Sequence, residues 1–187
     1  DRLLQGDVGS GKTAVAAATL YVTIKAGYQT AIMAPTEILA NQHFETFFEF
    51  FKDSNISVAL LTSSTPKKDK NTILSLLEVG EIELLIGTHS LIQEDVKFNN
   101  LKYVITDEQH RFGVKQRQLL SNKGEAVNSL MMTATPIPRS LAITLITDIK
   151  VSTIDELPAG RKKVQTYKAT NKSFYKVLDN IRMELDN

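Results

Sequence analysis

An eight-residue segment near the start of the chain has the residue types and spacing of a phosphate-binding loop, G-x-x-x-x-G-K-[ST]. It consists of Gly6, Asp7, Val8, Gly9, Ser10, Gly11, Lys12 and Thr13. Glycines at these positions let the backbone bend so that main-chain N–H groups point at phosphate oxygens. We expect Lys12 to contact the β- and γ-phosphates and the Thr13 hydroxyl to ligate Mg²⁺. The segment predicts a site for a nucleoside triphosphate with Mg²⁺.

The residues on both sides of this segment favour that interpretation over a plain glycine turn. Leu3 and Leu4 suit a short buried strand, and residues 12–26 are good helix formers that stop at Gly27. A helix that begins at the loop directs the positive end of its dipole at the bound anion. The order strand, loop and helix is therefore the one that phosphate binding requires.

A pair of carboxylates at the end of another apolar run is the second candidate site. Residues 102–106 have the composition of a strand and are followed by Asp107, Glu108 and, two residues on, His110. We expect Asp107 to hold Mg²⁺ and Glu108 to orient and deprotonate the attacking water. His110 would sense the γ-phosphate and relay its loss, or would be a structural histidine. We assign His43 to helix surface or packing.

Hydroxyl groups recur where a predicted strand meets a predicted helix. They belong to Ala34-Pro35-Thr36, Gly87-Thr88-His89-Ser90 and Thr133-Ala134-Thr135-Pro136. Ligands of open parallel sheets bind at the carboxyl ends of the strands. These turns should therefore lie at the same edge of the sheet as residues 6–13, here called the glycine loop. Each turn has two interpretations: a further phosphate site at a helix N-terminus, or simply a helix cap in the case of Thr36 and Thr135.

Strand-like and helix-like segments alternate along the chain. The apolar runs are residues 29–34, 57–61, 82–87, 102–106 and 129–133, and the helix-like runs are residues 37–51, 66–79 and 136–146. This alternation predicts an α/β fold with a mostly parallel sheet and helices on both faces. We expect one helix to bury the five phenylalanines at 44, 47, 48, 50 and 51, because of their helical spacing.

The domain organisation follows from a change of composition near residue 150. Residues 1–150 are expected to form one domain, residues 151–163 a polar and turn-prone linker, and residues 164–187 the truncated beginning of a second domain. Within that last part we expect a strand at residues 164–168 and a helix at residues 173–185.

Composition and charge restrict the class of protein. The chain has 187 residues, 42% of them hydrophobic, and no cysteine, so a disulfide scaffold is excluded. It lacks a run of about 20 apolar residues and a basic leader, so we expect a cytoplasmic protein with no membrane association. The net charge is only +1, so any contact with nucleic acid must be local.

Five segments in a fixed order resemble the motifs of superfamily 2 helicases, which use two RecA-like lobes to hydrolyse ATP while moving along nucleic acid. Motifs I, Ia, Ib, II and III resemble residues Gly6 to Thr13, Ala34-Pro35-Thr36-Glu37, Gly87-Thr88-His89-Ser90, Asp107-Glu108-Gln109-His110 and Thr133-Ala134-Thr135. The resemblance implies a RecA-like P-loop NTPase lobe that uses ATP and Mg²⁺.

The same resemblance implies a role for each candidate residue. Catalysis would fall to Lys12, Asp107, Glu108 and His110. DNA would be contacted by Thr36, Thr88 and His89, and coupling between the two sites would involve Gln109, Thr133 and Thr135.

A narrower resemblance points to one branch of this superfamily, double-stranded DNA translocases that regress stalled forks and migrate Holliday junctions in repair and recombination. It is carried by residues 2–13, 107–114, 135–139 and 154–158. The transcription-repair coupling factor is the alternative, but it typically has Phe at the position of Ser10 and Glu at that of Gln109. A nucleotide switch without turnover is a second alternative, against which the intact Lys12, Asp107 and Glu108 argue.

The resemblance also implies partners within a longer chain. An upstream wedge domain would split the junction, and a second RecA-like lobe would supply an arginine finger, which contributes about 10³ to 10⁵ in rate in related phosphoryl transfer. The isolated fragment is therefore expected to bind Mg-ATP weakly, to hydrolyse it barely and to unwind no DNA by itself.

Overall fold

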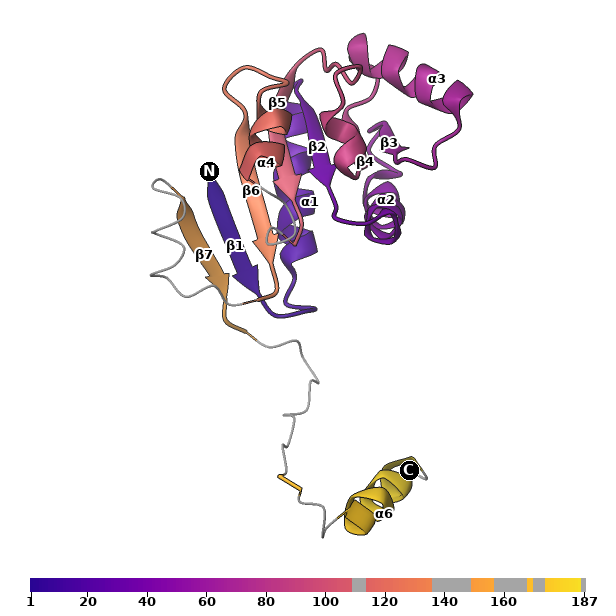
Figure 1. The fold of residues 1–187 in the computed structure, drawn as a ribbon. Coiled ribbons are helices and arrows are strands. Elements are labelled where there is room, and N and C mark those ends of the chain that lie inside the picture. The colour runs from indigo at the N-terminus through magenta and orange to yellow at the C-terminus, as the bar shows by residue number, and fades with distance from the viewer. Residues whose placement is uncertain (109–113, 136–148, 157–167, 170–173, 186–187) are drawn as a thin grey trace.

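A seven-stranded sheet in the order β3-β4-β2-β5-β6-β1-β7 forms the centre of the computed structural model, which describes residues 1–108, 114–135, 149–156, 168–169 and 174–185 (Figure 1). All of its strand pairs are parallel. The strands are β1 (Arg2–Gly6), β2 (Gln29–Met33), β3 (Val58–Leu61), β4 (Leu84–Gly87), β5 (Leu101–Thr106), β6 (Asn128–Thr133) and β7 (Lys150–Ile154). This sheet confirms the predicted α/β class.

Described helices lie between the successive strands from β1 to β6. The described helices are α1 (Lys12–Lys25), α2 (Glu37–Phe51), α3 (Lys67–Glu78), the 3₁₀ helix η1 (His89–Ile92), α4 (Val114–Ser121) and α6 (Phe174–Leu185). Among them, none is long and apolar enough to cross a bilayer. The helix start expected after Gly87-Thr88 is the short 3₁₀ helix η1, whereas α4 was not among the helix-like runs identified in the sequence.

Two separate hydrophobic cores lie on the two faces of the sheet. On one face, Leu20 of α1 and Phe47 of α2 pack against Ile32 of β2. On the other face, residues of α3, η1 and α4 pack against the neighbours of Ile32 in the same strand, Ala31 and Met33. Since alternate residues of a strand point to opposite faces, a central strand must be apolar throughout, and all five residues of β2 are buried.

The sheet extends beyond residue 150, where the sequence placed the start of a linker. Strand β7 pairs in parallel with β1, from Arg2 opposite Lys150 to Gly6 opposite Ile154. It is an edge strand with two exposed and three half-buried residues, so it lacks the continuous apolar run of the central strands. Residues 151–154 therefore belong to the sheet, which corrects the predicted boundary.

The prediction that helix α2 buries five phenylalanines is wrong for two of them. Phe47 and Phe51 are buried, and Phe44 is partly buried against the same core. Phe48 and Phe50 are 55% and 52% exposed. At about 100° per residue, positions 47 to 51 circle the whole helix, so one buried face cannot hold them all.

Several predictions lie outside the described residues. They concern the helix at residues 136–146, residues Gln109 and His110, the linker from residue 157, and residues 164–167 of the predicted strand. The helix predicted at residues 173–185 is confirmed as α6.

Candidate functional site

The glycine loop joins β1 to α1 with two residues in the left-handed backbone region. Gly9 has φ +79° and Gly11 φ +96°, values that glycine adopts without steric cost. The Lys12 Nζ donates hydrogen bonds to the carbonyl oxygens of Gly6, at 2.7 Å, and Asp7, at 2.8 Å. These bonds hold the ammonium group of Lys12 against the backbone of the loop. The N–H groups of the same loop would bind a phosphate.

Helix α1 begins without a side-chain cap. Its N-cap residue is Gly11, no side chain accepts a hydrogen bond there, and the first turn contains no acidic residue. The N–H groups of a helix start carry the positive end of the dipole and need acceptors. This helix start therefore suits an anionic ligand.

The Ser10 hydroxyl is the one buried side-chain nitrogen or oxygen without a hydrogen-bond partner in the described part of the chain. The loop is closed tightly around it, since a Cβ on Gly6 would come within 2.5 Å of Ser10 Oγ. An unsatisfied buried polar group costs about 1–3 kcal/mol. A phosphate oxygen in the loop is the kind of partner that would remove this cost, so the residues present fit a nucleotide.

The two acidic residues follow β5 at the same edge of the sheet. The backbone N–H of Asp107 donates to the carbonyl oxygen of Met33 at 3.0 Å, which extends the β2–β5 ladder by one bond. Asp107 Oδ1 accepts from the N–H of Glu108 at 3.0 Å. Glu108 has φ +51°, an uncommon value outside glycine that occurs preferentially at functional sites.

Strand β6 lies between the strand of the acidic residues and the strand of the glycine loop. Neighbouring strands are about 4.8 Å apart, so β5 and β1 are separated by roughly 10 Å. At the end of β6, the hydroxyls of Thr133 and Thr135 are 2.9 Å apart, and Thr133 is fully buried. The segment predicted to couple the sites thus lies at the end of the strand between the two parts of the candidate nucleotide site.

The oxygen atoms available at the candidate site suit Mg²⁺ better than a metal ion that is coordinated by protein side chains alone. No group of three or more His, Asp or Glu side chains in the described residues is arranged to hold a metal ion. Magnesium usually keeps several waters and binds through one or two protein oxygens plus substrate phosphates. Thr13 and Asp107 offer oxygens of this kind.

The three residues predicted to contact DNA differ in exposure. Thr36 Oγ1 accepts from the N–H of Leu39 at 3.3 Å, so Thr36 is the N-cap of α2. Thr88 is only 2% exposed, and its hydroxyl lies 3.4 Å from that of Ser90. His89 is exposed at the start of η1. Of the Thr88-His89 pair, the histidine is the side chain that a ligand can reach.

The turn after β3, residues 62–65, is a further hydroxyl-bearing strand end that was not identified from the sequence. The Ser64 backbone N–H and hydroxyl donate to the carboxylate of Glu37, at 3.1 and 2.9 Å. The hydrogen bond from the Ser64 hydroxyl holds the pKa of Glu37 below its ordinary value. The sequence signal was present, because Thr62 to Thr65 also stand between a strand and a helix. The turn extends the hydroxyl-bearing edge over β3, β4 and β2.

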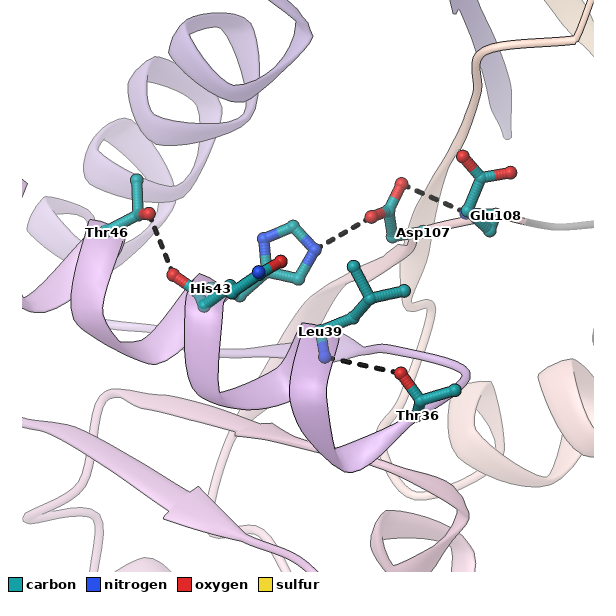
Figure 2. A network of polar contacts seen from close by, with 7 residues as sticks. Thr36, Leu39, His43, Thr46, Asp107 and Glu108 are labelled. Carbon is teal, nitrogen blue, oxygen red and sulfur yellow. Dashed lines mark hydrogen bonds and ion pairs between the residues drawn. The ribbon is translucent and has the colours of Figure 1, made fainter. Parts of the chain in front are cut away.

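His43 was also missed, because we assigned it to helix surface or packing. Its Nε2 lies 2.8 Å from Oδ2 of Asp107 (Figure 2). The two residues are 64 positions apart, and no spacing rule connects them. Only the pairing of β2 with β5 brings the helix that follows β2 to the carboxylate that follows β5.

The amino-acid sequence matches a helicase family model and is similar to known DNA helicases. Residues 1–143 match the family model for DEAD/DEAH box helicases. The ATP-dependent DNA helicase RecG of Bacillus subtilis is 55% identical over 185 residues, which are 99% of this chain and 27% of that protein. RecG of Staphylococcus aureus (strain NCTC 8325 / PS 47) is 56% identical over 184 residues, 98% of this chain and 27% of that protein.

A solved structure of RecG bound to a three-way DNA junction has the same fold. It matches with a TM-score of 0.83 at 50% sequence identity, over 98% of this chain and 25% of that one. These matches confirm the resemblance to superfamily 2 helicases and to the narrower branch identified from the motif residues. The chain spans about a quarter of the length of the relatives that it matches.

Proposed function

The chain belongs to the DEAD/DEAH box helicase family, and we propose that it is the first motor lobe of a RecG-type ATP-dependent DNA helicase. The protein that contains it would remodel branched DNA, such as stalled forks and Holliday junctions, during repair and recombination. Its relatives named RecG and the RecG structure on a three-way junction support this assignment.

The observation that carries the proposal is the position of two chemically matched groups at one edge of a parallel sheet. The glycine loop follows β1, the pair Asp107-Glu108 follows β5, and only β6 separates them. One group suits the phosphates and the other suits the metal and the attacking water. Phosphoryl transfer depends mainly on such positioning and on electrostatic stabilisation.

The side chains have distinct roles in this proposal. Lys12 would bind the β- and γ-phosphates, and Thr13 and Asp107 would hold Mg²⁺, which would neutralise charge on the phosphates. Glu108 accepts a proton from the water that attacks the γ-phosphate. His110 and Gln109 remain proposed participants in sensing and coupling.

We propose that DNA is bound along the other half of the same edge, at the turns that follow β3, β4 and β2. Hydroxyls, backbone N–H groups and helix N-termini can hold a phosphate backbone without a large positive charge. That mode of binding agrees with a net charge of +1. We also propose that the protein acts in the cytoplasm, because the relatives named as DNA helicases are bacterial proteins.

The complete motor would need parts beyond this lobe. The relatives are nearly four times as long as the segment that matches, so we propose a second RecA-like lobe and a junction-splitting wedge domain in the same full-length protein. ATP would bind between the two lobes. Accordingly, this lobe alone would bind Mg-ATP weakly and hydrolyse very little of it.

Conversion of a synthetic three-way junction tests the proposal. The full-length protein with Mg-ATP should convert the junction into its separated products on a native gel, and the Lys12→Ala variant should not. Conversion without ATP, or none by the unsubstituted protein, would contradict a DNA motor.

A further inference from the structure

His43 of helix α2 makes direct contact with the carboxylate proposed to hold Mg²⁺ (Figure 2). The distance from His43 Nε2 to Asp107 Oδ2 is 2.8 Å, and the two side chains are only 13% and 16% exposed. A hydrogen bond shielded from water in this way is more constraining than one on the open surface. No role for His43 follows from the motifs in the sequence.

The contact adds a side-chain partner to the backbone groups that orient Asp107. Its Oδ1 accepts from the backbone N–H of Glu108 at 3.0 Å, and its own N–H is bonded to Met33. An ionised carboxylate only accepts hydrogen bonds, so His43 must carry its hydrogen on Nε2. With a separate partner on each oxygen, the carboxylate cannot rotate freely about its bond to Cβ.

The imidazole itself rests on rigid structure. Its ring centroid lies 6.0 Å from that of Phe47, a fully buried core residue one turn further along the same helix. Helix α2 is fixed at its start by the Thr36 cap. The histidine therefore connects the core, and the helix that starts at the proposed DNA edge, to the proposed metal site.

We propose that His43 is a positioning residue that orients Asp107 toward Mg²⁺. The inference rests on the proposed ATP site but goes beyond it, because it assigns a role to a residue that acts through its contact with Asp107. Partners that orient a ligating side chain typically contribute about 10- to 100-fold in metal affinity. We expect His43 to contribute in this range through the orientation of one carboxylate.

A titration of bound nucleotide with Mg²⁺ tests this role in the full-length protein. The binding of a fluorescent ADP analogue is measured first in EDTA and then at increasing Mg²⁺. His43→Ala should raise the Mg²⁺ concentration at half-maximal effect about 10-fold or more and leave the affinity in EDTA unchanged. His43→Gln should restore much of the loss, because its amide nitrogen occupies nearly the position of Nε2.

Gln42→Ala is the matched control, since Gln42 is the exposed neighbour on the same helix, and it should behave as the unsubstituted protein. A His43→Ala variant with an unchanged Mg²⁺ requirement would overturn the proposal. An equal loss of affinity in EDTA would also overturn it, since this would indicate general damage to the fold. A lack of rescue by glutamine would do the same, since it would mean that the hydrogen bond to Asp107 is not the cause of the effect. If the unsubstituted protein bound no nucleotide at all, the proposed ATP site would fail first.

Discussion

The two halves of the carboxyl edge of the sheet differ in whether their hydroxyl groups have partners within the protein. On the β5–β6–β1 half, helix α1 starts without a cap and the Ser10 hydroxyl is buried without a partner. On the β3–β4–β2 half, Thr36 caps α2, Ser64 is bonded to Glu37, and the Ser90 hydroxyl donates to Leu61. The first half therefore leaves a buried hydroxyl for which an anion would be a partner, whereas the hydroxyls of Thr36, Ser64 and Ser90 in the second half already have partners within the protein.

This difference indicates how each half should respond to substitution. A site with unsatisfied groups concentrates its binding energy in a few residues, because a charged ligand is the partner they require. A surface that is already hydrogen-bonded binds through many weak contacts, as expected where a protein follows a phosphate backbone without reading its sequence. Substitutions in the β5–β6–β1 half, the proposed nucleotide half, should therefore have large effects. Substitutions in the β3–β4–β2 half, the proposed DNA half, should have small ones.

The largest effect should come from Glu108→Gln in the full-length protein. Amide in place of carboxylate keeps the size of the side chain but removes the base, so kcat for ATP should fall about 10² to 10⁴-fold. Nucleotide affinity should be retained. Steady-state hydrolysis and equilibrium binding check this, with Glu125→Gln, an exposed residue remote from the site, as the control. Undiminished turnover would remove Glu108 from the role of base.

Lys12→Ala should have the next largest effect. Loss of a hydrogen bond to a charged group costs about 1.5–3 kcal/mol, which corresponds to roughly 10- to 100-fold in the affinity for Mg-ATP. Calorimetric titration measures it. Lys25→Ala is a suitable control because Lys25 lies at the far end of the same helix and contacts Ser54. If both variants bound ATP equally well, the concentration of binding energy in the glycine loop would be disproved.

In the DNA half, Thr36→Ala combined with His89→Ala should weaken DNA binding without changing DNA-free ATP hydrolysis. An exposed polar contact contributes up to about 1 kcal/mol, so we expect at most about fivefold per residue in fluorescence anisotropy. Thr88 is left intact, because its side chain is buried. Thr36→Ser, which keeps the cap, is the control. A loss of nucleotide binding would mean that the two halves are not separate.

The smallest effect should come from Glu37→Gln, through stability. Because Ser64 lowers the pKa of Glu37 in the folded state, this bond stabilises the fold above the unfolded pKa and is lost as pH falls through the folded pKa. The variant should melt slightly below the unsubstituted protein at neutral pH. The gap should begin to close only as the pH falls below the ordinary pKa of glutamate, about 4.3, and should disappear once the pH is below the lowered pKa of the folded state. A gap that stays constant with pH would contradict this account.

The arrangement of the candidate nucleotide half, that is, where its residues lie in the fold, was largely predictable from the sequence, because its signals are local. The pattern from Gly6 to Thr13 specifies the loop, and the rule that ligands meet the carboxyl ends of parallel strands places Asp107 at the same edge. Periodicity gave the α/β class for a similar reason, since strands covered on both faces must be continuously apolar.

What the sequence could not reveal depends on tertiary pairing. The contact of His43 with Asp107 exists only because β2 and β5 are neighbours. The burial of Thr88 results from its fit beside Ser90, whose hydroxyl is bonded to Leu61 of β3. Strand β7 was missed because the half-exposed edge of a sheet tolerates polar residues, which gave Lys150–Ile154 the composition of a linker.

The central claim, that the nucleotide half drives work on DNA held by the other half, is tested most directly by the DNA dependence of ATP hydrolysis. We predict that a three-way junction raises the steady-state rate of the full-length protein severalfold over the DNA-free rate. The Glu108→Gln variant should show no such increase while still binding both ligands. An ATP hydrolysis rate that is the same with and without junction DNA would contradict the claim.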